Sequence, residues 1–329
     1  MRIKIAGTGR ALPHTCRTTA EYEDALGLPC GQLSAAVGVA QRYVCEEESQ
    51  IDLAVAAAEA ALRDAGLAAS DIDLVLAGCA VPYQPIPATA PLVMSRLGIA
   101  DGMAQAFDVN STCLSFLTAF GTAARMITCG EVQRALVFSS EVASRALPWQ
   151  QDPEVAALFG DGAAAAVVTG SAEAGGTLKA TLMRSYPSLY DACALAAGGT
   201  RFDFARDPER FARHALFQME GKPLFRLAAQ KFGGFVTDLL DRAGWTRDEV
   251  SLVVPHQASP AALAHMIRQT GFDPSIVMDI TRDYGNQIAA SIPFVLDMAR
   301  REGRIHAGDK LLFLGTSAGV SFGGMALEY

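Results

Sequence analysis

The sequence predicts an α/β protein built from two similar halves, chiefly because it contains an internal repeat. Segments 62–76 and 240–254 match at a constant offset of 178 residues. Each copy has the pattern of an amphipathic helix, a glycine stop, an acidic turn and a buried strand. The apolar, strand-like runs 135–138 and 311–314 form a second matching pair. Two halves that each alternate strands and helices predict two similar α/β units, with chance similarity as the alternative.

The most linker-like stretch of the chain is 170–176, which contains only glycine, serine, alanine and glutamate. We therefore expect a first half that covers residues 1–172 and a second half that covers residues 173–329.

Composition and charge exclude several classes of protein. Half of the 329 residues are apolar, which is enough for a substantial core. The formal net charge of -8, without a basic stripe, argues against nucleic acid as a partner. No apolar run is long enough to span a membrane, and Met1 leads directly into a strand-like run rather than a signal peptide. We expect a cytoplasmic protein with no membrane association.

The cysteines and histidines indicate neither a disulfide framework nor a metal site. The seven cysteines are scattered, odd in number and without a Cys-x-x-Cys pair, which favours reduced thiols in a cytoplasm. The five histidines show no metal-ligand spacing with them. We therefore expect no bound metal.

One cysteine, Cys113, lies where a strand-like run gives way to small polar residues and then to the apolar segment 114–127. That segment is apolar on nearly every side, as in a buried helix, and Ser111 or Thr112 is the expected N-cap. A thiol in the first turn of such a helix lies near the positive end of its dipole, which predicts a lowered pKa. Cys113 is a candidate nucleophile, with a small buried cysteine as the alternative.

Two later segments place polar side chains at the tips of predicted elements. The run 252–258 contains a strand that ends on His256, and the run 283–291 is a glycine turn that presents Asn286 at a helix start. One Cys, one His and one Asn, far apart in sequence and each at the tip of an element, are typical of a nucleophilic site.

This trio resembles that of the 3-oxoacyl-[acyl-carrier-protein] synthase III family, condensing enzymes of the thiolase superfamily. The resemblance runs nearly from end to end and includes the runs 5–13, 159–164 and 315–319. It implies the five-layered αβαβα thiolase sandwich, with the site at the seam between the halves. The first half then carries the cysteine, and the second half carries the histidine and the asparagine.

The resemblance implies a decarboxylative Claisen condensation of an acyl thioester with malonyl-acyl-carrier protein. Cys113 would accept the acyl group, because thiolates attack thioesters readily. The backbone amides of Cys113 and, by resemblance, of Ala318 would form the oxyanion hole. Hydrogen bonds from His256 and Asn286 would hold the enolate that forms when the malonyl group loses carbon dioxide. No cofactor is implied beyond the CoA or phosphopantetheine thioesters that serve as substrates.

Asp161 lies between two glycines and is a candidate base. The run favours instead a tight structural turn before the apolar strand 164–168.

Departures from the family pattern lie where substrates are recognised. Gln32 replaces a tryptophan that stacks on the CoA adenine in members that use acetyl-CoA, and Ala36 replaces an arginine. Loss of the aromatic stacking predicts weak or altered recognition of CoA. The primer is then expected to arrive on a carrier protein or as a different thioester.

Three further residues take their expected roles from the resemblance. Ile86 aligns with a phenylalanine that closes the acyl pocket across a homodimer in acetyl-specific members, so a longer or branched acyl chain is expected. Relatives of the olefin pathway carry a glutamate there, and Ile86 cannot act as that base. Arg226 and Arg268 match basic positions that dock the acyl carrier protein, although such side chains are often only solvated.

Two other functions stay open. An acyltransferase of the same fold would move an acyl group to an oxygen or nitrogen acceptor, but such relatives tend to lose the His–Asn pair. A catalytically silent scaffold is the second, and the intact trio argues against it. The identity of the primer and the biosynthetic pathway lie beyond the sequence.

Overall fold

In the computed structural model, which describes residues 1–171 and 176–329, the chain forms two main β-sheets. The first has the strand order β1-β7-β6-β4-β5, with β1 (Ile3–Ala11), β4 (Leu74–Ala77), β5 (Gln105–Asp108), β6 (Arg134–Glu141) and β7 (Gly162–Gly170). The second has the order β11-β12-β13-β8, with β8 (Thr177–Ser185), β11 (Leu252–Pro255), β12 (Lys310–Ser317) and β13 (Ser321–Glu328). The expected boundary between residues 172 and 173 lies outside the described residues.

The two sheets share one topology. In the first, β4 runs parallel to β6, β6 antiparallel to β7, and β7 antiparallel to β1. In the second, β11 runs parallel to β12, β12 antiparallel to β13, and β13 antiparallel to β8. The parallel ladders even keep the register of the sequence repeat, because Leu74 pairs with Ala135 and Leu252 with Leu311. The prediction of two similar halves is confirmed.

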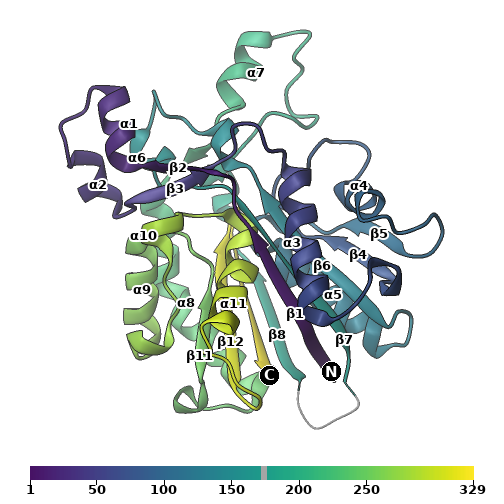
Figure 1. The fold of residues 1–329 in the computed structure, drawn as a ribbon. Helices are drawn as coiled ribbons and strands as arrows, with labels where there is room; N and C mark the ends of the chain where they lie inside the picture. The colour runs from purple at the N-terminus through teal and green to yellow at the C-terminus, as the bar shows by residue number, and fades with distance from the viewer. Residues whose placement is uncertain (172–175) are drawn as a thin grey trace.

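Helices on both faces of each sheet complete five layers (Figure 1). Helices α3 (Gln50–Ala65) and α4 (Thr89–Arg96) pack on the outer face of the first sheet. Helices α5 (Ser115–Thr128) and α11 (Ser291–Arg301) lie between the sheets in the largest apolar cluster. Helices α8 (Gly221–Ala243) and α9 (Pro260–Thr270) cover the outer face of the second sheet. The expected αβαβα sandwich is confirmed.

A buried carboxylate joins the halves through the central layer. Asp297 of α11 is fully buried and accepts a hydrogen bond of 2.7 Å from the hydroxyl of Thr8 on β1. It also pairs with Arg10 of β1 and, at 2.9 Å, with Arg301. Because removal of one partner from a buried ion pair costs about 3–5 kcal/mol, this cluster fixes α11 against the first sheet.

Smaller elements complete the fold. The remaining strands are β2 (Thr15–Thr18), β3 (Gln41–Val44), β9 (Cys193–Ala194) and β10 (Gln218–Met219). The remaining helices are α1 (Thr19–Leu26), α2 (Gln32–Val37), α6 (Pro153–Ala156), α7 (Pro208–His214) and α10 (Thr281–Tyr284). The 3₁₀ turns are η1 (Ala69–Asp71), η2 (Thr112–Leu114), η3 (Ala143–Ala146), η4 (Pro187–Ala192), η5 (Arg247–Glu249), η6 (Pro274–Ile276) and η7 (Ile288–Ala290).

Two of these features bear on the surface of the molecule. Helix α7 stands clear of the layers, at the end of the molecule opposite the two termini (Figure 1). Among the described residues, no helix combines the length and the apolar character that crossing a membrane requires.

Candidate active site

A tight turn places Cys113 between β5 and α5. The turn is η2, and its first residue, Thr112, has a φ of 53°, a left-handed conformation that is costly for a β-branched residue. Asn110 holds it by accepting a 2.9 Å hydrogen bond from the Thr112 amide through Oδ1. The Ser115 hydroxyl donates to the Thr112 carbonyl at 2.6 Å. Cys113 therefore lies one turn ahead of α5 rather than within it.

The second half contains the same turn before α11. Ile288, the first residue of η7, has a φ of 49°. Oδ1 of Asn286 accepts a 2.8 Å hydrogen bond from the Ile288 amide, and the Ser291 hydroxyl donates to the Ile288 carbonyl at 2.9 Å. Asn286 is therefore the structural counterpart of Asn110. The internal duplication extends to the candidate site itself.

The amide nitrogens of the two asparagines also make matching bonds. Nδ2 of Asn110 donates to the carbonyl of Ala80 at 2.9 Å, and Nδ2 of Asn286 donates to that of Ala258 at 3.2 Å. Asn286 is only 6% exposed. Since an amide NH₂ carries two protons, Asn286 keeps one N–H that a substrate oxygen can accept.

The backbone of β12 brings the two turns together. A Cβ added at Gly315 would come within 2.9 Å of both the Cβ of His256 and Cδ2 of Leu114, the residue after Cys113. Thr112 Oγ1 donates to the carbonyl of Ala318 at 3.2 Å. Asn286 in turn is bonded to the residue two places after His256. The structure thus gathers the predicted Cys, His and Asn, together with the Ala318 loop, at the seam between the halves.

Burial dominates the electrostatics of Cys113. It raises the pKa of the thiol above its ordinary value, and nearby Cys193 and Glu141 act in the same direction. The backbone amides of Ala318 and of Cys113 itself oppose this shift by donating to the sulfur. The predicted lowering of the Cys113 pKa is wrong, because desolvation outweighs the helix end. The amides expected to form an oxyanion hole do both point at the sulfur.

His256 follows β11 directly and is 5% exposed. Burial lowers the pKa of the imidazole to about 4, and a hydrogen bond with the Ile288 carbonyl opposes this shift. The ring is therefore neutral at pH 7. Nδ1 lies 2.7 Å from the Ser291 hydroxyl oxygen. When that hydroxyl donates to Nδ1, the ring proton resides on Nε2, and His256 can donate a hydrogen bond through Nε2.

Asp161 is a structural residue, as the turn at residues 160–162 predicted. It is fully buried, and its carboxylate accepts hydrogen bonds from the amides of Cys45 at 2.8 Å and Ser144 at 2.9 Å. It also accepts from the Ser144 hydroxyl at 2.6 Å. These bonds pin the loop after β6 to the end of β3.

The sequence gave no reason to single out Glu141, a buried acid at the end of β6. Its Oε1 accepts a hydrogen bond from the Ala80 amide at 2.5 Å, and its Oε2 has no partner among the described residues. Burial raises the pKa of this carboxyl to about 8, against the backbone amides of Ala80, Val81 and Ala289. Glu141 thereby contacts both the Ala80 loop, which holds Asn110, and the turn that follows Asn286.

The other predicted site residues lie on the surface. Ile86 is 86% exposed on the loop between β4 and α4. Arg226 of α8 and Arg268 of α9 are exposed on two helices that pack against each other. Gln32 and Ala36 are exposed on α2. The structure contains one chain, so the roles expected for these residues stay predictions.

All seven cysteines lie in the described ranges, and none forms a disulfide. Within residues 1–171 and 176–329, no group of three His, Cys, Asp or Glu side chains is placed to hold a metal ion.

Comparisons with known proteins match this geometry. Residues 107–187 match the model of 3-oxoacyl-[acyl-carrier-protein] synthase III, and residues 240–329 match that of its C-terminal part. Beta-ketoacyl-[acyl-carrier-protein] synthase III 3 of Streptomyces coelicolor is 37% identical, over 99% of this chain and 96% of its own. The Neisseria gonorrhoeae beta-ketoacyl-[acyl-carrier-protein] synthase III is 33% identical, over 99% of each chain.

A solved structure agrees in fold. The crystal structure of 3-oxoacyl-[acyl-carrier-protein] synthase III from Aquifex aeolicus superposes with a TM-score of 0.89 at 31% identity, covering 99% of this chain and 100% of that one. With the family models, the full-length relatives and the shared architecture in agreement, the chain belongs to the 3-oxoacyl-[acyl-carrier-protein] synthase III family.

Proposed function

We propose that this enzyme joins an acyl thioester primer to malonyl-acyl-carrier protein by decarboxylative Claisen condensation, through an acyl-Cys113 intermediate. The observation that carries the proposal is the meeting of a buried thiol, two backbone amides aimed at its sulfur, a neutral imidazole and an asparagine with a free N–H. This set provides a nucleophile, an oxyanion site and two uncharged donors for an enolate.

In the first half-reaction, the Cys113 sulfur attacks the carbonyl carbon of the primer thioester. The amides of Cys113 and Ala318 stabilise the oxyanion, and each such donor contributes about 3–4 kcal/mol to the transition state. Collapse breaks the primer's C–S bond, and the departing thiolate takes up the thiol proton. Because burial raises the Cys113 pKa, this proton leaves during the attack rather than before it.

In the second half-reaction, malonyl-carrier protein loses carbon dioxide, and charge develops on its thioester oxygen. Nδ2 of Asn286 and Nε2 of His256 donate to that oxygen. A neutral histidine suits this role, since it donates without having to titrate. The enolate carbon then attacks the acyl-Cys113 carbonyl, a C–C bond forms, and the Cys113 sulfur leaves as thiolate.

The partners follow from the same proposal. The acyl carrier protein docks near Arg226 and Arg268, whose exposed guanidinium groups lie on adjacent helices and make no ion pair among the described residues. The active assembly is a homodimer in which Ile86 of one subunit enters the acyl pocket of the other. Support comes from its position, because 86% exposure is unusual for an isoleucine in a monomer.

The proposal is tested with malonyl-carrier protein labelled in its free carboxylate. Condensation predicts one labelled carbon dioxide released for each 3-oxoacyl product, and this release depends on the acyl primer. Acyl transfer to an added alcohol or amine without release of carbon dioxide would replace condensation by the acyltransferase alternative.

A further inference from the structure

The segment between β9 and β10 leaves the candidate active site and returns to it. At its start, Cys193 lies close enough to Cys113 to raise the pKa of that thiol. At its end, the Phe217 ring packs edge-on against Phe159, with ring centres 5.0 Å apart. Phe159 in turn forms a β-bridge with Asn286. Whatever the outer part of this segment binds is therefore held above the catalytic residues.

The outer part carries α7 and an aromatic ring that orients two arginines. His214 stacks on Phe202 with ring centres 4.3 Å apart. The guanidinium carbons of Arg201 and Arg210 lie 5.6 Å and 5.2 Å from the centre of the Phe202 ring. Stacking of a guanidinium on an aromatic ring leaves its N–H groups free at the edge. Both arginines are thus pre-positioned as hydrogen-bond donors.

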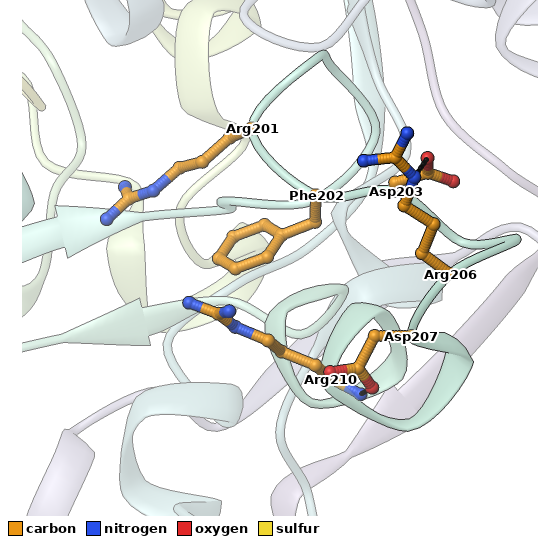
Figure 2. Close-up of a pocket in the computed structure, with 6 residues that line it drawn as sticks. All are labelled: Arg201, Phe202, Asp203, Arg206, Asp207 and Arg210. Carbon is orange, nitrogen blue, oxygen red and sulfur yellow. Dashed lines mark hydrogen bonds and ion pairs between the residues drawn. The ribbon is translucent and has the colours of Figure 1, made fainter.

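These residues line a shallow hollow of about 180 Å³ (Figure 2). Figure 2 shows the guanidinium groups of Arg201 and Arg210 extending to the same side, away from Asp203 and Asp207. Asp203 is paired with Arg206 at 3.3 Å, and Asp207 accepts the Arg210 amide at the start of α7. The hollow therefore presents donors on one side, with the acids engaged on the other.

The charges of the two arginines are poorly neutralised. Arg210 has no carboxylate partner within the described ranges. Arg201 pairs with Asp191 at 2.8 Å, but both side chains are more than half exposed, so the pair is weak and open to exchange. Two neighbouring guanidinium groups with spare donors match a phosphate, which they bind through several charge-assisted hydrogen bonds.

We infer that Arg201 and Arg210 bind the phosphate group at the far end of the substrate's pantetheine arm, the phosphate that CoA thioesters and carrier-protein thioesters share. The inference rests on the proposed function, because it assumes a pantetheine thioester at Cys113. It assigns to the α7 segment the recognition of the arm rather than of the acyl group.

The test compares thioesters of one acyl group on four carriers: CoA, 3′-dephospho-CoA, acyl carrier protein, and pantetheine without its phosphate. The Arg201→Gln/Arg210→Gln double variant is expected to raise the KM for the first three carriers about tenfold and to leave the KM for the pantetheine thioester unchanged. Arg210→Lys keeps the charge but loses the stacked fork, and an intermediate KM is expected. Arg213→Gln is the matched control, because Arg213 is exposed on the same helix but does not line the hollow.

Unchanged KM values for the phosphate-bearing thioesters would overturn the inference, as would an equal rise for pantetheine. A rise for the CoA thioester that is absent with 3′-dephospho-CoA would assign the site to the ribose phosphate and overturn it too. Failure of the proposed function would look different, since no carrier would then acylate Cys113 in the unmodified enzyme.

Discussion

Ser291 provides a sharp test of the site, because one hydroxyl proton sets the tautomer of the proposed enolate donor. Its oxygen lies 2.7 Å from Nδ1 of His256, and the Ile288 carbonyl competes for the same proton at 2.9 Å. In Ser291→Ala, Nδ1 loses this donor, and the Ile288 carbonyl remains as an acceptor for a ring N–H. The tautomer with its proton on Nε2 is then disfavoured.

The size of the effect follows from the cost of one buried hydrogen bond. Loss of such a partner costs about 1–3 kcal/mol, and about 1.4 kcal/mol corresponds to a factor of ten in rate. We expect Ser291→Ala to slow malonyl decarboxylation at least about tenfold and to change self-acylation of Cys113 less than about twofold. Single-turnover acylation and release of labelled carbon dioxide measure the two steps separately.

Ser115→Ala is the matched control. Ser115 is fully buried at the start of α5 and bonds the carbonyl three residues earlier, as Ser291 does at the start of α11. The two variants should lose similar stability, but only Ser291→Ala should lose decarboxylation selectively. Equal losses in both half-reactions for Ser291→Ala would refute the tautomer argument and leave Ser291 a helix-start residue.

Three further outcomes are expected. Charge reversal at both Arg226 and Arg268 should raise the KM for malonyl-carrier protein, less so at high salt; unchanged kinetics at low ionic strength would remove them from the docking surface. Ile86→Phe should shift the primer preference toward short acyl chains, since each excluded methylene is worth about 0.8 kcal/mol; an unchanged chain-length profile would end that assignment. The lowered pKa of His256, about 4 against about 6.5 when unfolded, should make the unfolded chain bind more protons between these values. Stability measured by urea unfolding should then be full above about pH 6.5 and fall by about 3 kcal/mol toward pH 4, a loss that His256→Gln should not share.

The fold could be predicted because the repeat is written in residues that determine local structure. The glycines after α3 and α8, at 66 and 244, adopt the left-handed conformation that ends a helix, and the strands after them are apolar at every position. These local signals survive without knowledge of the tertiary structure. The pairing of the sheets then follows from their identical connections.

Part of the site escaped the sequence because its repeat has a different spacing. The Asn-x₄-Ser pattern that forms both turns, at 110–115 and 286–291, is offset by 176 residues rather than 178. A comparison at one fixed offset therefore misses Asn110 and Ser291. The raised pKa values of Cys113 and Glu141 could not be foreseen either, because desolvation depends on packing from both halves of the chain.

The central claim is that Cys113 carries the acyl group, and mass spectrometry of the acylated protein tests it most directly. After incubation with a panel of acyl thioesters, the peptide that contains Cys113 should gain the mass of one acyl group. That mass should disappear when malonyl-carrier protein is added, and Cys113→Ala should gain none. An acyl group found on another residue, or an adduct that forms equally well in Cys113→Ala, would contradict the account.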